Sequence, residues 1–236
     1  MVKYDILMRC KNEILDLPTV AQSIEAQNVA PQTVVFVDSG STDGSREFAA
    51  QSGYNVVDYA ASNFNYSVSL NLGMRHCTSD FVLILSAHCI LYNEDAVENL
   101  LKNAVMPQVA GVFGRQIPTK NSTPIDVRDL LTVFGRERIV YEKHPFFHNA
   151  FSLVNHGLWE QIPFDESLNG IEDRVWAREA CDRGWKIVYE PDAVALHEHG
   201  LNQSASQSRA LRVCRALSTL HKNDIIEFPE NITSVD

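Results

Sequence analysis

Apolar runs of strand length alternate with segments of helical period through the first half of the chain. Such alternation is typical of βαβ units, in which parallel strands form a sheet that helices cover. The run at residues 81–85 is apolar throughout, which indicates a strand buried on both faces. The pattern predicts strands at residues 4–9, 33–37, 55–59 and 81–85, and helices that begin near residues 16, 45, 67 and 93.

The second half of the chain has a looser pattern. A helix is expected over residues 171–183, because Glu172 and Asp173 stand where a first turn favours acids and Gly184 stands where helices stop. Residues 134–143 are interpreted as a mobile excursion. The polar clusters Arg115-Gln116 and Asp126-Val-Arg128-Asp129 could contact a ligand, and we interpret them as ordinary solvated loop. The remaining predicted elements are strands at 109–115, 146–154, 186–189 and 193–196 and a helix over 204–222.

These elements predict an α/β fold with a Rossmann-like, mostly parallel central sheet flanked by helices. We expect one domain over residues 1–203, followed by a C-terminal helix and tail over 204–236. A chain of 236 residues with 45% hydrophobic residues is long enough to bury the core of such a domain.

Charge and cysteine usage narrow the classes of function. A formal net charge of −10 excludes a general nucleic-acid binder, which needs clustered Lys and Arg against phosphates. Five cysteines without C-x-x-C spacing indicate a reducing compartment. The longest apolar run, residues 81–91, is far shorter than the ~20 residues that span a bilayer, and the N-terminus has no signal-peptide pattern. We therefore expect a cytoplasmic protein, peripheral at most to the inner face of the membrane.

The loop after the second predicted strand carries the first candidate chemistry. Asp38 ends that strand, and small residues including Ser39, Gly40 and Ser41 follow it. Open α/β sheets bind ligands at the carboxyl ends of their strands, where a carboxylate can accept from a ribose or a base. Tight turns use the same residues to cap themselves, so the loop by itself has both interpretations.

The stretch Val37-Asp-Ser-Gly-Ser-Thr-Asp-Gly-Ser45 resembles the nucleotide-binding loop of family 2 glycosyltransferases of the GT-A fold. Further motifs over residues 4 to 200 follow the order of that family. They are Arg9-Cys-Lys-Asn-Glu13, Ser69-Leu-Asn-Leu-Gly73, Pro163-Phe-Asp-Glu166, Gly170-Ile-Glu-Asp173 and Gly184 through His197. The resemblance implies a nucleotide-sugar donor and a nucleotide site formed by Arg9, Asn12, Glu13, Asp38, Ser39, Ser41, Asn71 and Ala87.

One departure from that family concerns the metal. The family's central strand ends in an Asp-x-Asp triplet that holds a divalent cation, whereas this strand ends in Ser86-Ala87-His88. A neutral imidazole can still hold Mn²⁺, although it suits the oxygen-preferring Mg²⁺ less well. His197 and His199 follow a predicted strand at the place where the family supplies a further ligand. The predicted metal set is therefore His88, His197 and His199, and the predicted cofactor is Mn²⁺ or Mg²⁺.

The resemblance also places the catalytic base. The segment with Phe164, Gly170 and Trp176 corresponds to the family's acceptor side, so Asp173 is predicted as the base and Glu172 as its nearest competitor. The implied reaction is a single displacement at the anomeric carbon, which inverts its configuration. A glycan or lipid-linked acceptor is expected, with bacterial surface polysaccharide as the product.

Two other functions stay open at this point. A catalytically inactive, transferase-like module that binds a glycan or a partner would explain the missing Asp-x-Asp carboxylates. A sugar nucleotidyltransferase shares a similar core, but Arg9 to Glu13 lacks the Gly-rich loop expected there. Separately, Arg209, Arg212 and Arg215 in the last predicted helix indicate a contact with anionic lipid or a partner domain.

Overall fold

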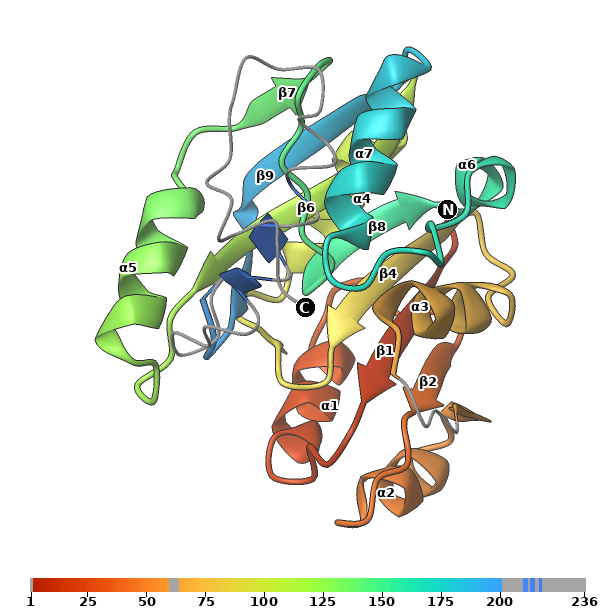
Figure 1. The fold of residues 1–236 in the computed structure, drawn as a ribbon. Coiled ribbons are helices and arrows are strands. Elements are labelled where there is room, and N and C mark those ends of the chain that lie inside the picture. Colours follow the sequence, from red (N-terminus) through yellow and green to blue (C-terminus); the bar gives the residue numbers. More distant parts are fainter. Residues whose placement is uncertain (1, 60–63, 201–209, 212, 215–216, 218–236) are drawn as a thin grey trace.

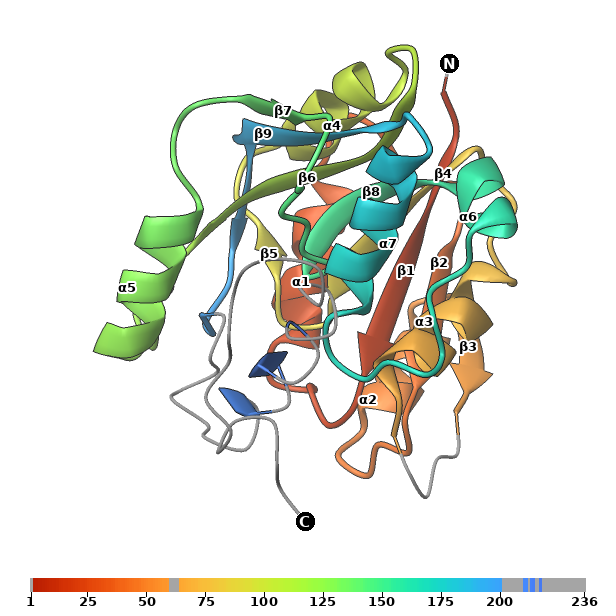
Figure 2. The ribbon, with the colours of Figure 1, turned by 45° about the horizontal axis from the view of Figure 1, so that its top comes forward.

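A computed structural model describes residues 2–59, 64–200, 210, 211, 213, 214 and 217. Helices cover both faces of one central sheet, and Figures 1 and 2 show these layers from two directions. The predicted fold class is confirmed. The boundary predicted at 203/204 falls among residues that the structure does not describe, as do Arg209, Arg212 and Arg215, so both interpretations stay predictions.

The N-terminal half of the sheet is parallel, as the alternating pattern predicts. Its strands lie in the order β3-β2-β1-β4, with each neighbouring pair parallel. The elements of this half are β1 (Tyr4–Cys10), α1 (Leu17–Glu25), β2 (Val34–Asp38), α2 (Ser45–Gln51), β3 (Asn55–Asp58), α3 (Tyr66–Met74) and β4 (Phe81–Ser86).

The C-terminal half of the sheet is mixed. Here β8 runs antiparallel to both β4 and β6, while β6 and β9 are parallel and β5 and β7 are antiparallel to β9. The elements are β5 (Ile90–Leu91), α4 (Ala96–Ala104), β6 (Val109–Ile117), α5 (Pro124–Val133), β7 (Ile139–Tyr141), β8 (Phe151–Asn155), α6 (His156–Gln161), α7 (Glu172–Asp182) and β9 (Lys186–Leu196).

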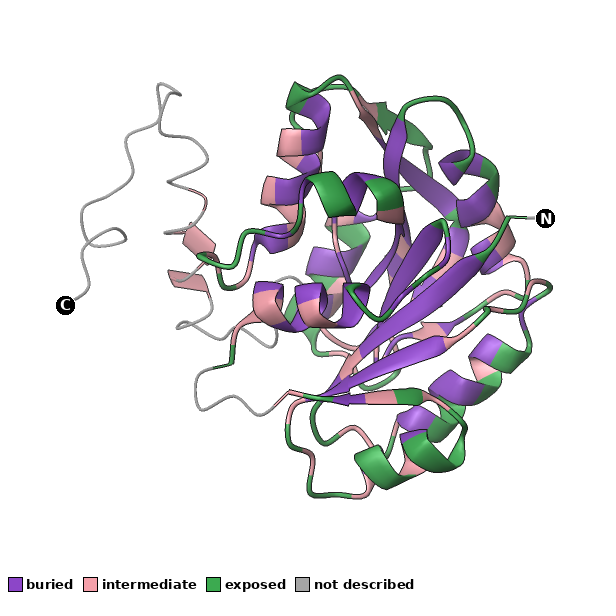
Figure 3. Ribbon diagram, turned by 90° about the vertical axis from the view of Figure 1, so that its right-hand side faces the viewer, coloured by how far each residue is buried: buried purple, intermediate pink, exposed green. Residues whose placement is uncertain are grey.

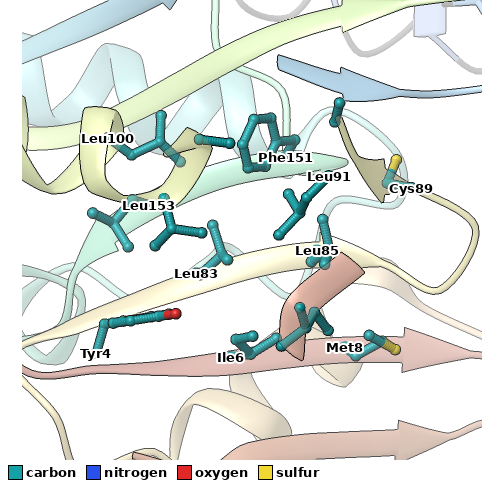
Figure 4. Packing of buried hydrophobic residues seen from close by; sticks show 14 of the residues in the cluster. Tyr4, Ile6, Met8, Leu83, Leu85, Cys89, Leu91, Leu100, Phe151 and Leu153 are labelled. Carbon is teal, nitrogen blue, oxygen red and sulfur yellow. The ribbon is translucent and has the colours of Figure 1, made fainter. Parts of the chain in front are cut away.

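Two apolar cores lie on the two faces of the sheet, because successive side chains of a strand point to opposite sides. Ile6 and Met8 of β1 belong to the core beneath α1 and α4, and Leu7 between them belongs to the core beneath α3 and α7. Figure 4 shows Ile6, Leu83 and Leu153 on neighbouring strands with Leu100 of α4 over them. Figure 3 shows the resulting buried strands between more exposed helix faces.

Close packing of α3 on the sheet depends on a glycine. A Cβ atom at Gly73 would stand 2.1 Å from Cδ1 of Leu7 and 2.9 Å from Cγ2 of Val37. Real Cβ atoms do not approach so closely, so any larger residue would force the Leu7 and Val37 side chains or α3 itself to shift.

Several predictions about the second half are wrong in detail. The second segment interpreted as solvated loop, around Arg128, is α5, whose N-cap Thr123 accepts a hydrogen bond from the Asp126 N–H and whose first residue is Pro124. Both are helix-start signals, which the polar composition of the segment concealed. The excursion at 134–143 contains β7, and the strand expected at 146–154 is the shorter β8. The last two predicted strands are one strand, β9, which has an irregularity where Glu190 pairs with Gly114 of β6 and Val194 pairs with the next residue, Arg115.

Candidate active site

A pocket of about 900 Å³ opens at the carboxyl ends of β1 and β4. The strand register aligns Arg9 of β1 with Val37 of β2 and with Ser86 of β4, so the loops that follow these strands meet at one edge. Of the residues predicted for the site, seven line this pocket, namely Arg9, Glu13, Ser39, His88, Glu172, Asp173 and His197. More than half of the predicted residues therefore meet at one pocket, and the others lie outside its lining.

Hydrogen bonds connect the loop after β1 to the loop after β2. The Asn12 N–H donates to Oγ of Ser41 at 3.0 Å, and Oδ1 of Asn12 accepts from the Thr42 N–H at 2.8 Å. Asn12 has φ of 59°, a left-handed conformation that asparagine tolerates better than most residues. Glu13 is fixed in the same way, because its N–H donates to Oγ of Ser45 at 2.9 Å. Asn12 and Ser41 thus shape the rim of the pocket and are not among its lining residues.

Asp38 is buried beneath that rim. Its side chain accepts hydrogen bonds from the N–H groups of Gly40 and Ser41, each at 3.0 Å from Oδ2, and the residue is 3% exposed. The carboxylate therefore holds the turn in which Ser39 reaches the pocket. The sequence allowed two interpretations of this loop, a turn that caps itself and a nucleotide contact. The hydrogen bonds of Asp38 match the turn that caps itself.

Asn71 and Ala87 lie away from the pocket lining. Both functional groups of the Asn71 side chain are bonded elsewhere: Nδ2 donates to the Phe164 carbonyl at 2.8 Å, and Oδ1 accepts from Nε1 of Trp159 at 3.0 Å. Ala87 is 1% exposed and belongs to the core under α1 and α4. Asn71 thus ties α3 to the segment that leads toward the acidic pair.

Glu172 and Asp173 begin α7 and both line the pocket. Glu172 is 5% exposed and accepts from the Gly170 N–H at 3.2 Å. Burial raises the pKa of Glu172 to about 7, the charge of Asp173 adds to the rise, and Arg9 opposes it. Asp173 is half-buried, and its oxygens accept from the N–H groups of Asn149 at 3.1 Å and Arg174 at 2.8 Å. The two neighbouring carboxyls therefore have different environments.

Two of the predicted histidines, His88 and His197, line the pocket, and the third, His199, lies beside them outside the lining. The Nε2 atoms of His88 and His197 are 3.2 Å apart, and the planes of the two rings are nearly parallel, at an interplanar angle of 13°. Nδ1 of His88 lies 3.1 Å from Oε1 of Glu13, and Nδ1 of His197 lies 2.8 Å from Oε1 of Gln116. The ring of His199 stands edge-on to His88, with centroids 5.6 Å apart.

These histidines fit a cation only in part. Among the described residues, no group of three or more His, Cys, Asp or Glu side chains is arranged to hold a metal ion. The His88–His197 pair brings two Nε2 atoms within 3.2 Å of each other, and imidazole nitrogens are ligands for Mn²⁺ and similar ions. The pair thus fits an open cation site that depends on further oxygen ligands from a substrate, not a closed three-histidine site.

Several pocket residues were not predicted from the sequence. Lys11 lies between Arg9 and Glu13 in the motif Arg9-Cys-Lys-Asn-Glu13, so its place in the pocket could have been predicted. The guanidinium of Arg9 lies 4.9 Å from the ring centroid of Tyr66, and that of Arg174 lies 5.0 Å from the centroid of Phe146. Arg174 directly follows Asp173, so its place in the pocket could also have been predicted. Arg128 and Asp129 belong to the polar cluster that was interpreted as a solvated loop, and that interpretation missed their place in the pocket lining. His148 carries no local signal.

Solved structures share this architecture at low sequence identity. The mannosyltransferase PcManGT from Pyrobaculum calidifontis, in complex with GDP-Man and Mn²⁺, superposes with a TM-score of 0.71 at 20% identity, covering 98% of this chain and 67% of that one. Glucosyl-3-phosphoglycerate synthase from Mycobacterium tuberculosis gives 0.66 at 18% identity, covering 96% and 80%. At these identities the likeness shows the fold alone.

Relatives in sequence are somewhat closer. The O-antigen chain rhamnosyltransferase RfbN of Salmonella typhimurium is 27% identical over 194 residues, covering 77% of this chain and 62% of the relative. WbaN of Salmonella anatum, also an O-antigen chain rhamnosyltransferase, is 27% identical over 188 residues, covering 75% and 60%. The chain thus spans about three fifths of the length of these relatives. The family model of glycosyl transferase family 2 matches residues 5–162, and the chain belongs to that family.

Proposed function

We propose that this protein is an inverting glycosyltransferase that transfers a sugar from a nucleoside-diphosphate sugar to a glycan or lipid-linked acceptor. The observation that carries the proposal is one pocket lined by an acidic pair on one element and by cationic and imidazole side chains on others. Displacement at an anomeric carbon needs both: a base for the acceptor hydroxyl and positive charge for the departing diphosphate.

Asp173 is the proposed base. Its carboxylate is half-buried, lines the pocket and accepts two backbone N–H bonds that hold it in one orientation. Glu172 is more deeply buried, and its raised pKa leaves a large fraction of it protonated near neutral pH. A protonated carboxyl cannot accept a proton, so Asp173 is the better base of the two.

Arg9, Lys11 and the His88–His197 pair are proposed for the diphosphate. All four side chains line the pocket, on the strand ends and loops after β1, β4 and β9. His88 and His197 would hold a divalent cation, which would neutralise charge on the leaving diphosphate. Ser39, on the turn that Asp38 holds, is proposed to contact the nucleoside.

The names of the relatives favour a particular donor and product. Both Salmonella proteins are O-antigen chain rhamnosyltransferases, which supports a deoxyhexose, rhamnose, as the sugar and bacterial surface polysaccharide as the product.

The described residues include no helix long and apolar enough to cross a membrane. From the cysteine usage and the basic residues of the last predicted helix, we propose a cytoplasmic location with peripheral contact to the membrane through Arg209, Arg212 and Arg215.

The test is transfer itself. The protein is incubated with a panel of nucleoside-diphosphate sugars, including rhamnose donors, and released nucleoside diphosphate is measured with and without Mn²⁺ and a glycan acceptor. Turnover with one donor is expected, and the anomeric proton of the product should show the configuration opposite to that of the donor. A product with retained configuration would contradict the inverting mechanism.

A second candidate function is a catalytically inactive module that binds a glycan or a partner. Ser86-Ala87-His88 at the end of β4, in place of an Asp-x-Asp triplet, favours it. Such a module releases no nucleoside diphosphate from any donor in the panel, whereas glycan binding persists. The same panel therefore separates the two functions.

A further inference from the structure

The side chain of Gln116 lies between two histidines at the end of β6. Its Oε1 is 2.8 Å from Nδ1 of His197, and its Nε2 is 3.0 Å from Nδ1 of His148. Gln116 is 1% exposed, and the neighbouring backbone is held by the His197 N–H, which donates to the Ile117 carbonyl at 2.9 Å. In this arrangement the carbonyl oxygen of Gln116 faces His197 and its amide nitrogen faces His148.

That orientation determines where His197 carries its proton. A carbonyl oxygen only accepts hydrogen bonds, so the 2.8 Å contact requires a hydrogen on Nδ1 of His197. A neutral imidazole carries one N–H, and its other nitrogen then presents a lone pair. Nε2 of His197, which faces His88, is therefore an acceptor.

Glu13 acts on His88 in the same way. Oε1 of its carboxylate lies 3.1 Å from Nδ1 of His88, which places the hydrogen of a neutral His88 on Nδ1 and a lone pair on Nε2. The two lone pairs then face each other across 3.2 Å. Two acceptors at that distance repel each other unless a cation, either a shared proton or a metal ion, lies against both.

The spacing of the pair suits a metal ion. Two nitrogens that each lie ~2.1 Å from one ion and 3.2 Å from each other subtend roughly 100° at the ion. This angle lies between those of octahedral and tetrahedral coordination. With the opposite orientation, the amide nitrogen of Gln116 would donate to Nδ1 of His197, and the His197 hydrogen would lie on Nε2. That hydrogen would bond to His88 and occupy the position of the ion.

We propose that Gln116 is a positioning residue that holds His197 as its Nδ1–H tautomer and so directs the Nε2 lone pair toward His88 and the pocket. The part of this inference that concerns cation binding rests on the proposed function, whereas the tautomer can be observed without any transfer reaction. Residues that hydrogen-bond to the other ring nitrogen of a metal-ligating histidine contribute about 10- to 100-fold to metal affinity.

The experiment is ¹⁵N NMR of the imidazole rings in the full chain, with His197 assigned by comparison with His197→Asn. In the wild-type protein, Nδ1 of His197 is expected to be the protonated nitrogen, and Zn²⁺ is expected to shift Nε2. In Gln116→Leu the two tautomers should mix, and the Zn²⁺ affinity measured by calorimetry should fall about 10- to 100-fold. Gln116→Glu, which keeps an acceptor for Nδ1–H, should retain the wild-type tautomer and an affinity within a few-fold of it.

Gln51→Leu, at the exposed end of α2, is the matched control and should change neither readout. A wild-type His197 with its hydrogen on Nε2, or unchanged Zn²⁺ affinity in a folded Gln116→Leu, would overturn the proposal. If Gln116→Leu does not fold, the wild-type and Gln116→Glu spectra still decide it. A protein with the expected tautomer that transfers no sugar would contradict the proposed function and leave this inference intact.

Discussion

The backbone N–H of Asn149 donates a hydrogen bond to Oδ2 of Asp173 at 3.1 Å and joins the segment ahead of β8 to the first turn of α7. The other carboxylate oxygen accepts from the Arg174 N–H at 2.8 Å. The side chain that we propose as the base is therefore oriented by backbone atoms of two separate segments. A site held in this way is pre-organised before substrate arrives.

Asp173→Asn should preserve donor binding and lower turnover by about 10²-fold or more, the usual contribution of general-base catalysis. The substitution keeps the size of the side chain but removes its basicity. Donor affinity is measured by calorimetry and turnover by release of nucleoside diphosphate. Glu172→Gln is the companion variant: if it loses turnover while Asp173→Asn keeps it, the base is Glu172.

Glu172 should make stability depend on pH. Its pKa is raised in the folded state from 4.5 to about 7, chiefly by burial. Between these two values Glu172 is protonated more in the folded protein than in the unfolded chain. Its contribution to the free energy of unfolding therefore falls as pH rises from about 4.5 to about 7.

Glu172→Gln removes this penalty. Its free energy of unfolding, relative to the wild type, should improve by roughly 1 to 3 kcal/mol on going from pH 4.5 to pH 8. Urea unfolding at the two pH values measures the difference. Glu160→Gln, an exposed position on α6, is the control and should show no such pH-dependent gain. An equal response of the two variants would mean that Glu172 ionises normally in the folded state.

Asp38→Ala should weaken binding of a nucleoside diphosphate by about 1 to 3 kcal/mol. The carboxylate holds the turn that presents Ser39, through the N–H groups of Gly40 and Ser41, so its loss disorders the rim of the pocket. Calorimetry with and without Mn²⁺ measures the affinity. Asp58→Ala, at the exposed end of the neighbouring β3, provides the comparison, and equal affinities of the two variants would remove Asp38 from the nucleotide site.

Asn71→Ala should lower the free energy of unfolding by about 2 to 4 kcal/mol, because it leaves the buried Nε1 of Trp159 and the backbone of Phe164 without their hydrogen-bond partner. Thermal and urea unfolding measure the loss. Asn121→Ala, in an exposed loop, should stay within about 0.5 kcal/mol of the wild type. A stable Asn71→Ala with impaired nucleotide binding would instead support the nucleotide contact predicted from the sequence.

The metal prediction has its own test. His88→Ala should abolish any stimulation of nucleoside-diphosphate binding by Mn²⁺, because the remaining imidazole of His197 presents only one nitrogen to the ion. Calorimetric titration of nucleoside diphosphate at fixed Mn²⁺ measures the response. His76→Ala, an exposed histidine that follows α3, controls for loss of a histidine elsewhere. An intact response in His88→Ala would show that the pair does not hold the cation.

Much of the fold could be predicted because it depends on local patterns. Strand-length apolar runs and helical periods located β1 to β4 and the helices between them, since periodicity of 2 or 3.6 residues is visible in any short window. The loops at the strand ends followed from the same reasoning, which is why Arg9, Glu13, Ser39 and His88 were found in the pocket. The prediction failed at α5, because the polar composition of that segment was given more weight than the helix-start signals of Thr123 and Pro124.

The sequence by itself determined the alternating α/β core, the edge of the sheet at which the pocket opens and the acidic pair at the start of α7. Only the tertiary structure decided that Asn71 bonds to Trp159 and that Gln116 meets His197, 81 positions along the chain. The Gln116–His197 contact depends on the register of β6 against β9, including its shift between Gly114 and Arg115, whereas the Asn71–Trp159 contact joins α3 to α6. Register between distant strands follows from the packing of the whole core, so no short window of sequence contains it.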